Sequence, residues 1–164
     1  MLTYANWSGR TIYFARGPTW SGQDNLYSYG ADQGPPQSLQ TFGGAFHVAY
    51  MVTTDSYTNY TIFYQSRPSG GSWSTRTALL AGYPAFAAHD LAIGPDGTLY
   101  VASCDNGGTM RVNTNHGSGW VTTTPSVPYC AGDMDSTVHA GRLYLAYRGT
   151  SGRLTVASLA TSSL

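Results

Sequence analysis

A pattern of two short runs joined by a polar, glycine-rich turn occurs four times in the chain and limits its fold more than any other feature. The first runs are residues 11–15, 47–51, 99–103 and 143–147, and the second runs are residues 25–29, 60–64, 110–113 and 153–157. Apolar and polar residues alternate in these runs, which predicts half-buried strands. Each pair therefore predicts a β-hairpin, and the recurrence indicates a repeat architecture.

Two further elements accompany the hairpins in the middle of the chain. Residues 72–75 (SWST) and 119–122 (GWVT) each begin with a small residue followed by Trp, and we expect them to form strands that follow a hairpin. Residues 89–97 (HDLAIGPDG) and, more loosely, residues 132–138 (GDMDSTV) precede a hairpin. Pro-Asp-Gly is a strong tight-turn signal. The combined unit is a four-stranded antiparallel meander.

The composition agrees with an all-β chain. All eight basic residues are Arg and all eight acidic residues are Asp, while Tyr occurs 13 times. Residues that favour helices are scarce and residues that favour strands are common. A formal net charge of zero offers no basic field for nucleic acid. The sequence has no apolar run of about 18 residues, so membrane insertion is not expected.

A single four-stranded blade cannot bury both of its faces, and radial packing of several blades solves this problem. The sequence therefore predicts one β-propeller domain over residues 1–164, with about four blades or as part of a larger ring. An immunoglobulin-like sandwich is the alternative. Residues 2–5 are expected to complete the last blade. If they do not, an open blade edge favours a homo-oligomer.

One segment resembles a known family motif. Residues 103–110 (SCDNGGTM) resemble the Asp-box of sialidase and BNR-repeat β-propellers, and residues 66–73 (SRPSGGSW) resemble a degenerate copy. The phrase AIGPDGTLYVA, residues 92–102, is also common in such propellers. The resemblance implies a propeller fold and a structural box in the turn between the third and fourth strands, formed by Ser103, Asp105, Gly107 and Thr109.

The chemistry of the box is structural. Asp105 is expected to accept backbone N–H groups, while Gly107 and Gly108 permit positive φ. Binding of Ca²⁺ by Asp105 is the alternative, and no other cofactor or metal is expected. His47, His89, His116 and His139 lack the close spacing of metal ligands.

Sialidase activity is disfavoured because the chain contains no Glu to activate a Tyr nucleophile and its Arg residues lack the expected context. Other glycoside hydrolysis requires two neighbouring carboxylates. Asp90, Asp133 and Asp135 are the candidates, because they lie near the starts of the predicted innermost strands. The alternative is that these residues stabilise turns.

The sequence favours a non-catalytic extracellular module that binds carbohydrate or another surface ligand. Its candidate ligand-binding residues are Trp7, Trp20, His89, Asp90 and Arg148. Trp73 and Trp120 occupy a repeated position and are expected to be structural. A glycoside hydrolase or lyase, and a structural or protein-interaction propeller, are the alternatives. Cys104 and Cys130 form either a disulfide, as in secreted proteins, or two buried thiols.

Overall fold

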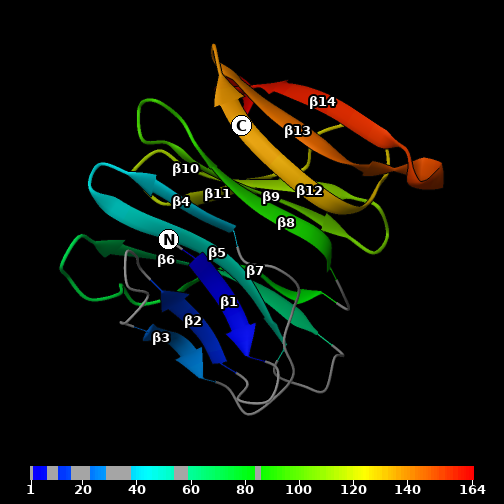
Figure 1. Cartoon of the computed structure of the whole chain (residues 1–164). Coiled ribbons are helices and arrows are strands. Elements are labelled where there is room, and N and C mark those ends of the chain that lie inside the picture. Colours follow the sequence, from blue (N-terminus) through cyan, green and yellow to red (C-terminus); the bar gives the residue numbers. More distant parts are fainter. Residues whose placement is uncertain (1, 7–10, 16–22, 29–37, 54–58, 84–85) are drawn as a thin grey trace. The chain divides into compact units, whose positions relative to one another are not determined.

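The computed structural model describes residues 2–6, 11–15, 23–28, 38–53, 59–83 and 86–164. In these residues the regular structure is β-strand, apart from two short 3-10 helices, and the strands pair antiparallel (Figure 1). The prediction of an all-β fold is confirmed. The chain divides into two compact units, Met1–Pro84 and Ala85–Leu164.

The first unit contains two sheets whose strands follow chain order. One sheet comprises β1 (Leu2–Asn6), β2 (Thr11–Ala15) and β3 (Gln23–Ser28). The other comprises β4 (Ser38–Phe42), β5 (Ala45–Thr53), β6 (Tyr60–Pro68) and β7 (Thr77–Tyr83). One face of β5 forms a small core in which Val48, Tyr50 and Val52 are buried. Leu39, Phe46, Phe63 and Trp73 pack against them.

The second unit also contains two sheets whose strands follow chain order. Its first sheet comprises β8 (Phe86–Ile93), β9 (Leu99–Asp105), β10 (Met110–Asn115) and β11 (Trp120–Thr123). Its second sheet comprises β12 (Cys130–His139), β13 (Arg142–Gly149) and β14 (Leu154–Ala160). The 3-10 helix Thr150–Gly152 joins β13 to β14, and another, Thr161–Ser163, follows β14.

The two sheets of the second unit share one core. The first sheet contributes apolar side chains from β8, β9 and β10, and the second contributes side chains from β12 and β13. The buried members are Ala92, Tyr100, Ala102, Cys104, Met110, Val112, Cys130, Leu143, Leu145 and Tyr147. The first strands of the two sheets, β8 and β12, lie side by side (Figure 1).

All four predicted hairpins are confirmed. They are the antiparallel pairs β2–β3, β5–β6, β9–β10 and β13–β14. The strands predicted at residues 89–97 and 132–138 correspond to β8 and β12, and the one at residues 119–122 corresponds to β11. The Pro-Asp-Gly turn is also present, since the Gly97 N–H donates to the Gly94 carbonyl at 2.9 Å.

Two expectations about strands are wrong. Residues 72–75 are not a strand, because β7 begins only at Thr77. Ser74 is instead bonded to β6: its N–H donates to the Ser66 carbonyl at 2.8 Å, and its Oγ accepts the Ser66 N–H at 3.0 Å. Residues 2–5 do not complete the last sheet, because they lie in β1, which pairs with β2. The short connection between β1 and β2 makes this local pairing inexpensive in loop entropy.

Candidate functional site

The sheet β12–β14 has one face in the core of the second unit and one face outside it. On β12, Ser136 and Val138 are more buried than Asp135 and Thr137, as strand alternation requires. The register places Asp135 opposite Ala146, and Thr137 opposite Tyr144. Further across the sheet, β14 contributes three residues, Leu154, Val156 and Ser158. We call this side of the sheet the outer face.

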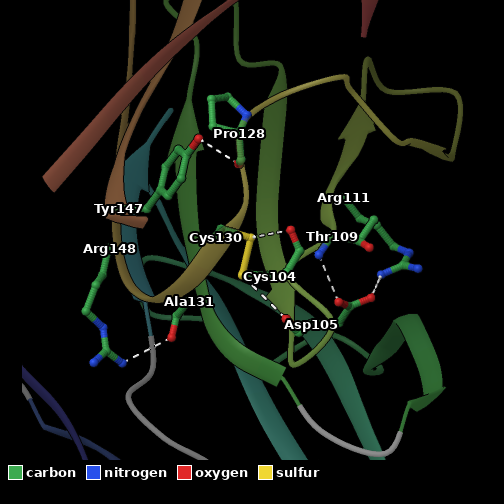
Figure 2. The surroundings of a disulfide bond; sticks show 10 residues. Cys104, Asp105, Thr109, Arg111, Pro128, Cys130, Ala131, Tyr147 and Arg148 are labelled. Atoms are coloured by element: carbon green, nitrogen blue, oxygen red, sulfur yellow. Dashed lines mark hydrogen bonds and ion pairs between the residues drawn. A yellow bond between two sulfur atoms is a disulfide. The ribbon is translucent and has the colours of Figure 1, made fainter. Parts of the chain in front are cut away.

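An irregularity in β12 shapes one end of the outer face. The pairing with β13 shifts between Cys130 and Met134, and Asp133 has a φ of 39°, in the left-handed region. Ala131 and Asp133 are therefore extra residues with no partner on β13, and a β-bulge of this kind redirects the side chains that it carries. Asp133 Oδ2 lies 3.4 Å from Arg148 Nε. Arg148 Nη2 also donates to the Ala131 carbonyl at 3.0 Å, which holds the guanidinium against the bulge (Figure 2).

The ion pair between Asp133 and Arg148 is open to solvent. The side chains are 88% and 51% exposed, respectively. An exposed pair of this kind contributes little to stability, about 0–1 kcal/mol. Both groups therefore remain accessible to a ligand.

A hollow of about 420 Å³ lies over this end of the outer face. Its lining combines the charged groups of β12 and β13 with apolar side chains, and comprises Asp133, Met134, Asp135, Ala146, Tyr147, Arg148, Gly152 and Leu154. A smaller hollow of about 110 Å³ is lined by Asp135, Ser136, Thr137, Tyr144, Ala146 and Val156. Asp135 and Ala146 line both hollows, so the two adjoin, and we call them together the outer-face groove.

The outer-face groove offers chemistry suited to binding. Asp135 and Asp133 supply acceptors, and Arg148 supplies donors. Tyr144 and Ala146 supply apolar surface beside them. Small-molecule sites usually combine an apolar lining with a few placed polar groups.

The structure brings together three of the residues singled out from the sequence, namely Asp133, Asp135 and Arg148. Asp90 and His89 lie elsewhere, on β8, and both are buried. Asp90 Oδ2 accepts a hydrogen bond from Ser136 Oγ at 2.5 Å. Ser136 and Asp135 are adjacent on β12 and point to opposite faces of the sheet. Asp90, which bonds to Ser136, therefore lies on the face opposite to Asp135. Trp7 and Trp20 lie outside the described residues.

Tyr144 and Thr137 are members of the groove that the sequence did not single out. Both lie in strands whose polar and apolar residues alternate, but nothing in the sequence marks which face of the sheet they occupy. The register between β12 and β13 reveals it, because it pairs Thr137 with Tyr144 beside Asp135. Strand pairing is thus the signal that finds them.

The Asp-box segment forms the turn between β9 and β10 and is built around Asp105 (Figure 2). The Thr109 N–H donates to Asp105 Oδ1 at 2.9 Å, and Arg111 Nη1 donates to Asp105 Oδ2 at 2.5 Å. The Gly108 N–H donates to the Asp105 carbonyl at 2.9 Å. Gly108 has a φ of 80° and so uses the freedom expected of it, whereas the φ of Gly107 is not positive. The carboxylate thus organises the turn.

The electrostatics of Asp105 follow from these partners. Burial acts to raise the pKa of Asp105, but the hydrogen bond and charge of Arg111, together with backbone N–H groups, outweigh burial and hold the pKa below its usual value. Arg111 already supplies a positive charge at Oδ2 of this carboxylate. This arrangement gives the Ca²⁺ alternative no support.

The position of the segment in its sheet differs from what the resemblance implies. The turn lies between β9 and β10, the second and third strands of β8–β11, rather than between the third and fourth. The degenerate copy at residues 66–73 does follow a third strand, β6. There Arg67 Nε donates to the Gly71 carbonyl at 2.6 Å, in place of an aspartate-centred turn.

A disulfide joins the end of β9 to the start of β12. It links Cys104 to Cys130, whose Cα atoms are 6.0 Å apart and whose side chains are fully buried (Figure 2). The Cys130 N–H also donates to the Gly108 carbonyl at 3.2 Å. The disulfide alternative is therefore the one that the structure shows, and it couples the Asp105 turn to the sheet that carries the groove.

No protein-family model matches this chain, and a comparison with curated proteins gives no match either. Within the described ranges, no group of three or more His, Cys, Asp or Glu side chains is arranged to hold a metal ion. The same ranges contain no helix that is long and apolar enough to span a membrane.

Proposed function

We propose that this chain is an extracellular, non-catalytic module of the β-propeller type that binds carbohydrate in the outer-face groove. The observation that carries the proposal is the convergence of Asp133, Asp135 and Arg148 on one depression, beside Tyr144 and apolar side chains. Sugars offer hydroxyl groups to carboxylates and guanidinium groups, and they offer apolar C–H faces to aromatic rings.

The propeller part of the proposal is supported by the sheets themselves. The strands of each sheet follow chain order, and both sheets of the second unit begin with strands that lie side by side, β8 and β12. Successive propeller blades have this relationship, with the first strand of each nearest the axis. The resemblance of residues 103–110 to an Asp-box supports the sialidase-like subtype, although its position in the sheet departs from that pattern.

The extracellular part of the proposal is supported by the disulfide. Disulfide bonds persist in oxidising compartments and are rare in the cytosol. The Cys104–Cys130 bond is weakly consistent with export.

The solvation of the groove favours binding over hydrolysis. A glycoside hydrolase needs one carboxyl group that stays protonated near neutral pH, which usually requires a desolvated environment. Asp133 is 88% exposed and paired with Arg148, and Asp135 is also exposed. Exposed carboxylates beside a guanidinium group suit hydrogen bonding to hydroxyl groups.

The proposal is tested by screening the purified chain on a glycan array and measuring the affinity for the best glycan by calorimetry. We expect Asp135→Ala and Arg148→Ala each to weaken binding about tenfold, equivalent to roughly 1.4 kcal/mol. Arg153→Ala is the matched control, because Arg153 is an exposed arginine near the same sheet that does not line the groove.

Three outcomes oppose the proposal. The absence of any glycan ligand would favour a structural or protein-interaction module. Equal loss of binding in the Arg153→Ala control would place the site elsewhere. Turnover of chromogenic glycosides that disappears in Asp135→Asn would favour a hydrolase.

A further inference from the structure

The outer edge of β14 differs from the corresponding edges of the two four-stranded sheets. β14 is the third strand of its sheet, as β6 and β10 are of theirs. β6 is covered by β7 and β10 by β11, whereas in the described part of the chain β14 pairs only with β13. The fourth-strand position beside β14 is therefore vacant in this part of the chain.

The hydrogen bonds of β13 and β14 show which backbone groups face that vacant position. The Gly149 N–H donates to the Arg153 carbonyl at 2.8 Å, and the Thr161 N–H donates to the Gly141 carbonyl at 3.0 Å. Alternate residues of an antiparallel strand face the same neighbour. Odd-numbered residues of β14 thus bond to β13, and the even-numbered residues direct their N–H and C=O groups outward. These are Leu154, Val156, Ser158 and Ala160.

Half of this edge is capped by the chain itself. The Ser158 carbonyl accepts a hydrogen bond from Arg142 Nη2 at 2.9 Å, and the Ala160 carbonyl accepts one from Ser163 Oγ at 2.8 Å. Such caps protect an edge from strand addition. Leu154 and Val156 have no such caps in the described structure, and the two residues are 78% and 64% exposed.

The rest of the strand lacks the usual protection of edges. β14 (LTVASLA) contains no charged residue and no Pro, and its register with β13 is unbroken. By contrast, β11 has four residues, and the pairing of β7 with β6 is irregular. Short or irregular strands are poor templates for pairing, and long regular ones are good templates.

We propose that β14 pairs antiparallel with β14 of a second copy of this chain, through residues 154–156. A twofold axis at Thr155 places Leu154 opposite the partner's Val156, and the reverse, which forms about four interchain hydrogen bonds. This register leaves the Arg142 and Ser163 caps in place. A segment that pairs with itself needs no second surface, so a closed dimer results.

The dimer has a consequence for the outer face. Both copies contribute even-numbered residues to the same side of the joined sheet, so Leu154 and Val156 of each copy lie beside those of the other. The two outer-face grooves then open on one side of a six-stranded sheet. The pairing itself does not rest on the proposed carbohydrate binding.

The first test is the molar mass of the intact chain in solution. Because the paired segment is short, we expect a monomer–dimer equilibrium with a midpoint on the order of 100 µM, typical of small interfaces. Val156→Pro removes an outward N–H without breaking a bond to β13. Val156→Lys keeps the backbone and adds a charge to the edge. Both variants should remain monomeric at concentrations at which the parent chain is dimeric.

The matched control is Val121→Lys on β11, because Val121 is 60% exposed and lies on a four-stranded sheet. This variant should dimerise like the parent chain. A parent chain that stays monomeric up to about 500 µM would overturn the proposal. Dimers that persist in both Val156 variants, or that are lost equally in Val121→Lys, would also overturn it.

The second test fixes the register. In the proposed dimer the two Thr155 residues form a non-hydrogen-bonded pair with Cα atoms roughly 4.5 Å apart, within reach of a disulfide. Thr155→Cys should therefore yield covalent dimers on mild oxidation, and Val121→Cys should not. Equal cross-linking of both variants would show collision rather than strand pairing.

Discussion

Ser136 Oγ donates a 2.5 Å hydrogen bond to Asp90 Oδ2 and so joins the first strands of two sheets, β12 and β8. Asp90 is only 9% exposed, although it is one of eight acidic residues in a chain poor in charge. A buried carboxylate is tolerated where hydrogen bonds replace its lost hydration. This link therefore gives Asp90 a structural role between the two strands, and its part in catalysis or ligand binding stays a prediction.

Removal of this link should destabilise the second unit. We expect Asp90→Ala to lower the free energy of unfolding by about 2 kcal/mol, because a hydrogen bond to a charged group is lost. Asp90→Asn should cost less, since a carboxamide oxygen still accepts from Ser136. Urea denaturation measures both values. A double-mutant cycle with Ser136→Ala should give a coupling energy above 0.5 kcal/mol, as expected for groups in contact, and additive effects would argue against the link.

Asp105 should make stability depend on pH in the acid range. Its folded-state pKa is lowered, so its contribution is present above the unfolded value near 4 and is lost as the pH falls through the folded value. Asp105→Asn should therefore unfold more easily than the parent chain at pH 7. At a pH below the folded value the two should approach each other. Denaturation curves at several pH values between 2 and 7 test this, and a gap that widens in acid would contradict it.

Much of the architecture could be predicted because it is local in sequence. The four hairpins follow from alternation within runs such as residues 47–51 and from the turns beside them. The strand expected at residues 72–75 failed because Ser74 bonds to β6 at both its N–H and its Oγ, and no alternation pattern reports such a contact. The prediction that residues 2–5 complete the last sheet was wrong because pairing between adjacent strands competes with pairing between distant ones.

The groove was only partly predictable. Asp133, Asp135 and Arg148 could be named as polar residues near strand ends, but their convergence depends on the β12 irregularity and on the register with β13. A shift of one residue would move Asp135 to the core face. The same alternation of faces along β12 separates Asp90 from Asp135. This alternation cannot be assigned to a face from a sequence whose strand partners are unknown.

Gly108 should be the most restrictive glycine of the Asp105 turn. A Cβ atom there would overlap the ring of Tyr129, and the φ of 80° is strained for any L side chain. Gly117 has a φ of 93° but open space around it. Gly117→Ala should therefore cost about 1 kcal/mol from backbone strain alone, and Gly108→Ala should cost clearly more.

The contribution of the ring can be separated from that of the backbone. In a Tyr129→Ala background, Gly108→Ala should cost about as much as Gly117→Ala does, because the overlap is gone. Thermal denaturation of the four variants measures the comparison. If Gly108→Ala costs the same with and without Tyr129, the ring moves aside freely and backbone strain accounts for the whole effect.

The disulfide should stabilise the second unit and resist reduction while that unit is folded. It closes a loop between residues 26 positions apart, for which the chain-entropy estimate is about 3.5 kcal/mol. Cys104→Ser with Cys130→Ser should lower the urea midpoint accordingly. Because both side chains are fully buried, reduction by dithiothreitol should require opening of the unit, so urea that destabilises the unit should strongly accelerate thiol release. A rate of thiol release that stays the same when urea destabilises the unit would indicate direct access.

His47 should give the first unit a second pH dependence, at a higher pH than Asp105. Its Nδ1 lies 2.6 Å from the Tyr64 hydroxyl, and the two side chains come from neighbouring strands, β5 and β6. Burial lowers the pKa of His47, more than a backbone hydrogen bond involving Phe42 raises it. Burial likewise raises the pKa of Tyr64. Both groups are therefore held neutral at pH 7.

The sign follows from the proton count. Between the folded and unfolded pKa values of His47, the unfolded chain binds more protons, so stability rises with pH and is lost as the pH falls from about 6.5. His47→Gln keeps a polar side chain that does not titrate, and it should flatten this dependence between pH 5 and 7. Asp105→Asn is the control, because it should leave that interval unchanged. NMR titration of the His47 ring would give its pKa directly, and a value at or above 6.5 would remove the basis for the prediction.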